Sequence, residues 1–381
     1  MKFYSTLSPG LEDIAANELE SLGAKILEKR EGKGRIFLEG NLELIAKINY
    51  FSRTIERLNI LLHREVLEDI SLDEIYKRVY EINWEDWIKE EQSFAVRPLR
   101  VGEHNFTSID IGRVAGEAVI KRYLSEKGVR LKVNLDEPDI IVRVELIFNE
   151  LLVAIDTTGD EGLHKRGYRV YNHPAHLNAT IAASLIYLSG WKDEEFLLDP
   201  MCGSGTIPIE GALIKRNIPI GKFRERRYGF SFVKIFGHEL LDKIKNCYNE
   251  NYRSYKIVGM DINSEYLEGA KKNAINANVI DTVKFLNGSA EELDKFFNSL
   301  DVIVTNPPYG IRMGKKRLIG KLYNNFLSSA KNLMHGDSRI VVITAESKLF
   351  KDAVIKNNFN IIKHFDVMFG GLLTKVYYIK L

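Results

Sequence analysis

The sequence contains few cysteines and no long apolar segment. Cys202 and Cys247 are the only cysteines among 381 residues, which argues against a disulfide framework and against a cysteine-rich zinc site. No apolar run is long enough to span a bilayer. The first ten residues, MKFYSTLSPG, lack the apolar core of a signal peptide. We therefore expect a cytoplasmic protein with no metal site and no membrane contact.

Excess charge and phosphate-binding glycine motifs are also missing. The formal net charge is only +2, so any surface that binds nucleic acid must be local. Neither Gly-x-Gly-x-x-Gly nor Gly-Lys-Ser/Thr occurs in the chain, which argues against a dinucleotide and against a nucleoside triphosphate as the ligand. The length exceeds that of one typical core, so we expect two or three domains.

The first 65 residues alternate between strand-like and helix-like segments. Apolar spacing and turn residues predict strands at Met1–Thr6, Gly34–Glu39 and Arg57–Arg64, with helices at Leu11–Leu22 and Asn41–Tyr50. This β-α-β-α-β order predicts a small ferredoxin-like α+β unit. Nothing in the segment indicates catalysis.

Residues 66–150 form a second, locally basic unit. The pattern predicts a helix that begins after Ser71, a strand at Ser93–Pro98, a helix at Ser108–Lys127 and a strand at Ile140–Phe148. Between residues 94 and 132 eight basic residues face only four acidic ones. Such a region suits contacts with phosphates, although a solvated charged face fits the composition equally well. The candidates for phosphate contact are Arg97, Arg100 and Arg113.

Two segments of this unit resemble a THUMP domain, an RNA-binding module of tRNA-modifying enzymes. They are Ser93–Pro98 and Asn105–Ile120. The resemblance implies that residues 66–150 are the THUMP domain. It also implies that residues 1–65, completed by about 151–160, are the ferredoxin-like domain that accompanies it. Recognition of the 3′ end and acceptor stem of tRNA would follow.

Residues 161–190 connect the two halves of the chain as a linker and a leading helix. Gly162–Arg169 is basic and punctuated by glycine, so we expect a loop near the domain junction, with Lys165 and Arg166 in contact with RNA. The segment is similar to the domain boundary of THUMP-containing RNA methyltransferases. Asn178–Gly190 reads as an apolar helix. A purely structural linker remains an alternative.

From about residue 191 buried strands alternate with helices. The strands are expected at Glu195–Asp199, Lys256–Asp261, Thr282–Leu286, Asp301–Thr305 and Arg339–Thr344. This alternation predicts a doubly wound parallel sheet over residues 191–381. The tail carries two further strands around Gly370 and Gly371, so the sheet should end in an antiparallel hairpin.

The ends of the first three strands predict a site for S-adenosylmethionine. Asp199 opens a loop whose glycines allow close approach of a ligand, and an acid there suits an ammonium group. Asp261, at the tip of the second strand, suits ribose hydroxyls, and Asn287–Ala290 could border an adenine. The expected cofactor-binding residues are Asp199, Cys202, Gly203, Ser204, Gly205, Thr206, Asp261, Ile262, Ser289, Ala290 and Asn306.

The fourth strand, Asp301–Thr305, leads into Asn306-Pro307-Pro308-Tyr309. The Asn306 amide oxygen and the Pro307 carbonyl could accept both N–H bonds of an exocyclic amine, and Tyr309 could stack on the ring that carries it. We expect Asn306, Pro307 and Tyr309 to be the catalytic residues. An ordinary proline-rich strand exit is the alternative, since Asn-Pro is a common turn starter.

The second half as a whole resembles the class I methyltransferases that act on exocyclic amines. The motifs that match are Asp199–Thr206, Asp261 and Asn306–Tyr309, whereas Ser289 stands where many relatives carry an acid. A long interval between Gly205 and Asp261 also resembles the guanine-N2 RNA methyltransferases. The expected fold is therefore α/β, a Rossmann-like class I methyltransferase domain after an N-terminal α+β region made of ferredoxin-like and THUMP parts.

Relatives that act on guanine 10 tend to carry an aspartate before Pro-Pro-Tyr, whereas this chain carries Asn306 there. In this respect the chain is similar to the enzymes that act on tRNA guanine 6 and on large-subunit rRNA. The resemblance implies methylation of guanine N2 in tRNA, above all at guanine 6 of the acceptor stem. Other tRNA positions and large-subunit rRNA stay open. Adenine-N6 methylation, protein-glutamine methylation and RNA binding without catalysis are alternatives of other classes.

Five basic residues follow the tetrapeptide with no acid among them, and we expect them to contact the RNA backbone beside the site. They are Arg312, Lys315, Lys316, Arg317 and Lys321, for which a solvated loop is the alternative. Cys202 could serve as a nucleophile, but its place in the cofactor loop favours a structural role. A paired guanine would have to leave its duplex to reach the site. We expect tRNA as the partner and no obligate protein partner.

Overall fold

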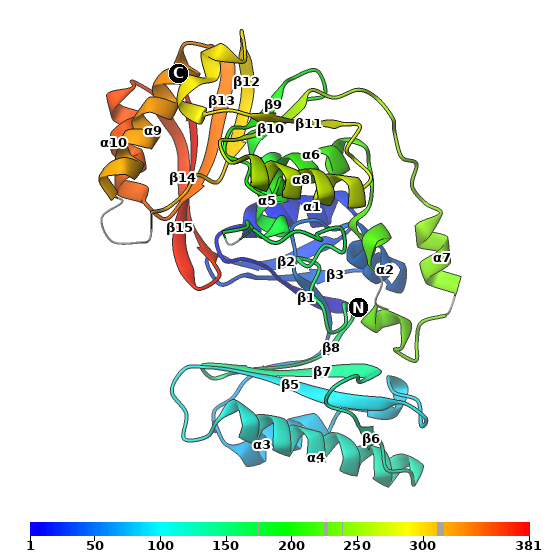
Figure 1. Ribbon diagram of the computed structural model, residues 1–381. Coiled ribbons are helices and arrows are strands. Elements are labelled where there is room, and N and C mark those ends of the chain that lie inside the picture. Colours follow the sequence, from blue (N-terminus) through cyan, green and yellow to red (C-terminus); the bar gives the residue numbers. More distant parts are fainter. Residues whose placement is uncertain (174, 225–227, 238, 311–315) are drawn as a thin grey trace.

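The computed structural model describes residues 1–173, 175–224, 228–237, 239–310 and 316–381. Over these residues the strands form two sheets, one in each half of the chain (Figure 1). The eight-stranded sheet has the order β2-β3-β1-β4-β8-β7-β5-β6, and the seven-stranded sheet has the order β11-β10-β9-β12-β13-β15-β14.

The N-terminal unit contains one more strand than the sequence predicts. Its elements are β1 (Lys2–Thr6), α1 (Glu12–Ser21), β2 (Lys25–Arg30), β3 (Arg35–Glu39), α2 (Leu42–Phe51) and β4 (Arg57–Val66). The predicted β-α-β-α-β order is therefore wrong, because β2 is missing from it. This strand lies at the sheet edge, and its residues alternate between exposed and half-buried without one that is fully buried. It lacks the apolar face by which strands are recognised in sequence.

The next unit extends the same sheet. It consists of α3 (Leu72–Tyr80), a 3₁₀ turn at Trp84–Asp86, β5 (Ser93–Val101), α4 (Ser108–Lys127), β6 (Lys132–Val133), β7 (Ile140–Ile147) and β8 (Glu150–Asp156). Antiparallel pairing of β4 with β8 joins the two units. In Figure 1 this part, with α3 and α4 beneath β5 and β7, lies below the rest of the molecule.

Helix α4 has the bounds that the sequence predicts, because both of its ends are specified locally. Thr107 and Asp110 form a reciprocal capping box at its start. Gly128 ends it in the left-handed region, with φ of +70°.

The C-terminal half is a doubly wound sheet, as predicted. Its elements are α5 (Ala179–Ser189), β9 (Leu197–Asp199), α6 (Thr206–Lys215), β10 (Ile257–Asp261), α8 (Ser264–Asn276), β11 (Val283–Asn287), β12 (Leu300–Thr305), α9 (Lys316–Lys331), β13 (Met334–Thr344), α10 (Ser347–Lys356), β14 (Asn360–Phe369) and β15 (Leu372–Lys380). Strands β9 to β13 run parallel, and β15 is antiparallel to both neighbours. The predicted terminal hairpin is confirmed. The strand order reverses at β9, where such sheets bind ligands.

The segment between α6 and β10 ties the two halves together. It contains 3₁₀ turns at Ile220–Phe223 and Gly229–Ser231 and the short helix α7 (Glu239–Lys245). Phe230 N–H donates to the Thr157 carbonyl at 2.9 Å, and Lys234 N–H donates to the Trp87 carbonyl at 3.0 Å. No helix among the described residues is long and apolar enough to cross a membrane.

Candidate active site

A cavity of about 830 Å³ opens at the carboxyl ends of the parallel strands. Asp199 at the end of β9, Asp261 at the end of β10 and Asn306 after β12 all line it. The linker before α5 and the tip of the β14–β15 hairpin complete the wall. Every predicted cofactor-binding residue except Gly205 lies on the lining, as do Pro307 and Tyr309.

Asp199 is a buried carboxyl with one unused oxygen. Its Oδ1 accepts hydrogen bonds from Thr305 Oγ1 at 2.7 Å and from Met201 N–H at 3.2 Å. Its Oδ2 accepts none from the described residues. Burial raises the pKa of Asp199 to about 7, and the nearby charge of Asp261 adds to the shift. A buried carboxyl that lacks a partner suits a ligand that brings a positive charge.

Asp261 fixes the glycine loop. Its Oδ2 accepts from Gly203 N–H and its Oδ1 from Asn263 N–H, both at 2.9 Å. Gly203 and Gly205 have φ of +50° and +78°, a region that favours glycine. A Cβ on Gly205 would lie 3.0 Å from the Ala270 side chain, so the loop packs directly on α8. Gly205 therefore supports the cavity from behind.

Cys202 has the environment of a structural residue. Its side chain is buried, and its N–H donates to the Met260 carbonyl at 2.9 Å. Burial, with a smaller contribution from Asp199, raises the pKa of the Cys202 thiol well above its ordinary value. The thiol is thus held in its protonated form, which is a poor nucleophile.

The strand exit at Asn306 is braced by hydrogen bonds. Tyr309 Oη donates to Asn306 Oδ1, and Tyr323 Oη donates to the Pro308 carbonyl at 2.9 Å. Burial raises the pKa of the Tyr309 phenol, which keeps its proton. The Pro307 carbonyl accepts no hydrogen bond from the described residues. An amide oxygen has two lone pairs, so Asn306 retains one for a ligand.

Several residues of the lining are not predicted from the sequence. Tyr266 lies in the first turn of α8, and its ring meets that of His173 edge-on with centroids 4.2 Å apart. The position of Tyr266 just after Asp261 was a usable signal. Phe369 and Leu372 reach the cavity from the hairpin tip. No local sequence pattern predicts that the hairpin tip packs beside the ends of the parallel strands. Among the described residues no cluster of three or more His, Cys, Asp or Glu could hold a metal ion.

One predicted RNA contact is wrong. The Arg166 side chain is only 1% exposed, and its guanidinium donates to Glu210, Leu163 O and Arg53 O. The glycine-punctuated sequence resembles an exposed loop, but this arginine instead joins the linker to α6 and to the N-terminal unit. Lys165 beside it is exposed.

The other basic residues predicted to contact RNA differ in how many partners their side chains have within the protein. Arg113 is exposed and forms no hydrogen bond or ion pair with the residues that the structure describes. Arg97 donates to the Leu135 carbonyl, and Arg100 donates to the Gly102 carbonyl. Lys316 lies 3.7 Å from Glu346, and Arg317 is exposed. Arg312 and Lys315 lie outside the described residues.

Comparison with protein-family models divides the chain into three matches. Residues 166–375 match the RMKL-like methyltransferase domain. Residues 70–156 match the THUMP domain, and residues 2–58 match the RlmL ferredoxin-like domain. The methyltransferase match alone covers more than half of the chain.

Similar proteins extend over the full length. A protein of Methanocaldococcus jannaschii named tRNA (guanine(6)-N2)-methyltransferase is 69% identical over 381 residues, covering 100% of both chains. One of the same name from Archaeoglobus fulgidus is 48% identical, covering 99% of this chain and 91% of the other. Among solved structures, SMU.472, a putative methyltransferase complexed with SAH, is 26% identical with a TM-score of 0.86, covering 99% and 97%. TrmN from Thermus thermophilus is 25% identical with a TM-score of 0.75, covering 100% and 99%.

Proposed function

The chain belongs to the RMKL-like methyltransferases that carry a THUMP domain, and we propose from this premise that it methylates the N2 amine of guanine 6 in tRNA. S-adenosylmethionine is the methyl donor. The observation that carries the proposal is the shared cavity in which Asn306-Pro307-Pro308-Tyr309 stands beside the unused carboxylate oxygen of Asp199.

The donor set of the cavity fits S-adenosylmethionine. Asp199 Oδ2 would bind the ammonium group, and the Asp261 carboxylate, already aligned by Gly203 and Asn263, would bind ribose hydroxyls. Ile262, whose side chain is exposed, and Ala290 would flank the adenine ring. Bound there, S-adenosylmethionine supplies an electrophilic methyl group.

The chain's own contribution to the reaction is to position the amine. The N2 lone pair of guanine is delocalised into the ring, which makes the nitrogen a poor nucleophile. The Asn306 oxygen and the Pro307 carbonyl would accept its two N–H bonds and favour a more tetrahedral nitrogen. The lone pair would then point toward the methyl group. Tyr309 would stack on the base, and no strong base is needed because the nitrogen becomes acidic as it gains positive charge.

RNA would be held by the THUMP domain and by cations around the cavity. Arg97, Arg100 and Arg113 would contact phosphates on the THUMP side. Lys165, Lys316 and Arg317 would do so near the cavity. Extrusion of a paired guanine costs a few kcal/mol, which stacking on Tyr309 would offset in part. We place this activity in the cytoplasm, where tRNA is modified.

The test is methylation of a tRNA transcript by the purified protein, followed by analysis of the modified nucleosides. We expect N2-methylguanosine at position 6. Asn306→Ala should lower the turnover by about 100- to 1000-fold, the usual cost of removing one transition-state contact of this kind, with tRNA binding retained. Methyl transfer to adenine or to another position would contradict the proposal, and full activity of Asn306→Ala would contradict the assigned role.

A further inference from the structure

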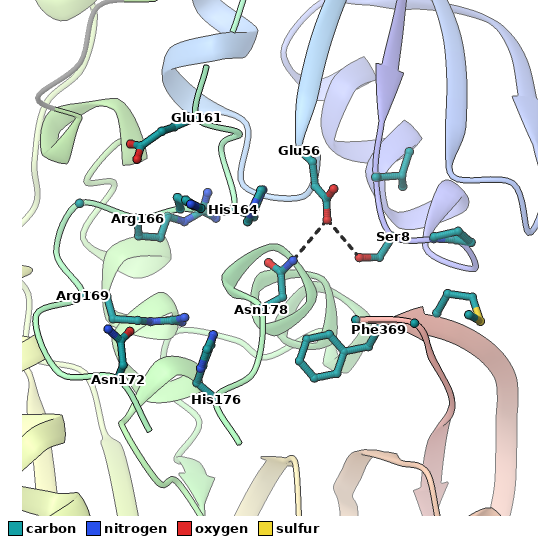
Figure 2. A pocket seen from close by; sticks show the side chains of 17 residues that line it. Ser8, Glu56, Glu161, His164, Arg166, Arg169, Asn172, His176, Asn178 and Phe369 are labelled. Atoms are coloured by element: carbon teal, nitrogen blue, oxygen red, sulfur yellow. Dashed lines mark hydrogen bonds between the residues drawn. The ribbon is translucent and has the colours of Figure 1, made fainter. Parts of the chain in front are cut away.

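A second cavity, of about 820 Å³, adjoins the first. The two share His176, Phe369 and Gly370 on their linings. The second cavity lies where four parts of the chain meet (Figure 2). They are the loop after β1, Glu56 directly before β4, the linker between residues 161 and 178, and the hairpin tip. Its lining is rich in polar and charged side chains, and the reaction outlined above uses none of its acids.

Glu56 presents an unused carboxylate oxygen to this cavity. Its Oε1 accepts from Ser8 Oγ at 3.4 Å and from Asn178 Nδ2 at 3.2 Å. Figure 2 shows both dashed lines ending on the same oxygen, and Oε2 has no hydrogen-bond partner among the described residues. Burial raises the pKa of Glu56, and these two hydrogen bonds only partly oppose the shift. The carboxyl is therefore positioned to accept one further hydrogen bond.

Three cations line the same cavity. Arg166 already donates to Glu210 and to two backbone carbonyls, so Lys165 and Arg169 are the two considered for a ligand. Lys165 is exposed and forms no ion pair with any residue in the described ranges. Arg169 is half-buried, and its Nη2 donates to the Leu177 carbonyl at 3.0 Å and to Thr206 Oγ1 at 3.2 Å. These bonds hold the guanidinium in place and leave its other N–H groups available. A fixed arginine and an exposed lysine on one lining suit a phosphate group.

We propose that this cavity binds the sugar and phosphate of a nucleotide next to the target guanosine, with Lys165 and Arg169 on the phosphate and Glu56 accepting a hydrogen bond from the ribose 2′-hydroxyl. The inference rests on the proposed function. An acid inside an RNA-binding enclosure repels phosphate, so its presence calls for a donor on the ligand. One free oxygen matches one hydroxyl, and the 2′-hydroxyl distinguishes RNA from DNA at a given site.

The variant Glu56→Gln distinguishes the proposed hydrogen bond to the 2′-hydroxyl from a general effect of the Glu56 charge on tRNA binding. Removing a negative charge near RNA should by itself tighten binding, whereas loss of an acceptor for the 2′-hydroxyl should weaken it. We expect the KM for tRNA to rise between about 10- and 100-fold, the loss typical of a hydrogen bond to a charged group. The affinity for S-adenosylmethionine should stay unchanged, which also reports that the variant is folded. The matched control is Glu161→Gln, in the same lining, for which we expect no rise in KM.

A modified substrate identifies the atom on the RNA. The tRNA is assembled from two annealed strands in two versions. One version carries a single 2′-deoxynucleotide before the target guanosine, and the other carries a single one after it. One of the two should raise the KM of the wild-type protein as much as Glu56→Gln does, and the combination should add nothing further, as expected for two groups in contact. If neither substitution affects the KM, or if the two effects add, the assignment to the 2′-hydroxyl is overturned.

Lys165→Ala tests the phosphate contact. The variant should weaken tRNA binding and reduce the slope of log affinity against log salt by about one. An unchanged slope would overturn that contact. Methylation of the unmodified tRNA by the wild-type protein serves as the reference throughout. If the wild-type protein does not methylate guanine N2, the proposed function itself fails. If it does, while Glu56→Gln behaves like the wild-type protein, only the second cavity's role fails.

Discussion

Asp199 combines complete burial with an incomplete set of hydrogen bonds, and its proton should therefore govern cofactor binding. With a pKa of about 7, the carboxyl is protonated in the free protein below that pH and must lose its proton before it pairs with an ammonium group. The Kd for S-adenosylmethionine should rise by up to about tenfold for each pH unit below 7. Calorimetric titrations between pH 5.5 and 8.5 measure this, and Asp199→Asn should bind more weakly with a flat profile. A pH-independent Kd in the wild-type protein would contradict the prediction.

The same group should affect stability with a definite sign. The folded protein keeps a proton that the unfolded chain releases above the ordinary pKa of 3.8. The wild-type protein without ligand should therefore lose stability relative to Asp199→Asn as the pH rises from about 4 to about 7, and no further above 7. Denaturant unfolding of both proteins across this range gives the difference. A difference that grows in the opposite direction would contradict the pKa assignment.

Tyr309 serves two purposes that substitutions can separate. Its hydroxyl donates to Asn306 Oδ1, while its ring is expected to stack on the guanine. Tyr309→Phe keeps the ring, so kcat/KM should stay within about tenfold of the wild-type value. Tyr309→Ala removes stacking worth about 1–3 kcal/mol, which corresponds to a loss of roughly 5- to 150-fold. Steady-state kinetics on tRNA measure both, and equal losses would show that the hydroxyl, rather than the ring, matters.

At the scale of helices and strands, the linker is held by a buried ion pair and not by its own sequence. The Arg166 guanidinium and the Glu210 carboxylate are almost fully buried, and Tyr168 Oη also donates to Glu210 Oε1 at 2.8 Å. Asn273 of α8 adds a second attachment, since its Oδ1 accepts from Val170 N–H and Tyr171 N–H. These contacts fix the segment that carries Lys165 and Arg169 into the second cavity.

Glu210→Ala would leave Arg166 buried without its charge partner. Breaking such a pair typically costs about 3–5 kcal/mol of unfolding free energy, so we expect a large fall in the urea midpoint. The control is Glu268→Ala, which removes an exposed partner of Lys271 and should change the midpoint little. If Glu210→Ala is as stable as this control, the buried pair does not hold the linker.

A helix, strand or loop can be predicted from the sequence when the residues that specify it lie within or beside it. The sequence predicts helix α4 because its caps are local. It also indicates the glycine loop and the Asn306 exit, because strand ends carry recognisable residues. Strand β2 was missed because a charged edge strand has no apolar face. The burial of Arg166 depends on Glu210, 44 residues away in sequence, and the second cavity depends on four separate segments. Local sequence patterns contain no information about contacts between segments that are far apart in the sequence.

At the scale of the whole molecule, hydrogen bonds between the two halves hold them in their relative position. The hairpin tip that lines both cavities is attached to the N-terminal unit, because Met368 N–H donates to the Pro9 carbonyl at 3.0 Å. The segment between α6 and β10 provides a second attachment through Thr157 and Trp87. We propose that the distance from the THUMP domain to Asn306 selects the base that is methylated, and these contacts would set that distance.

Gly10 lies at the hairpin contact and offers a direct test of it. A Cβ on Gly10 would approach the Asp366 carbonyl oxygen to 1.9 Å, and its φ is +100°. Gly23, with φ of +104°, has nothing within 4 Å of the same position, so Gly23→Ala carries the backbone strain without the clash. We expect Gly10→Ala to cost about 1–3 kcal/mol more than Gly23→Ala in unfolding free energy. It should also lower tRNA methylation while S-adenosylmethionine binding persists, since the displaced tip carries Phe369 and Leu372. Equal stability and equal methylation in the two variants would show that the hairpin contact does not set the geometry of the site.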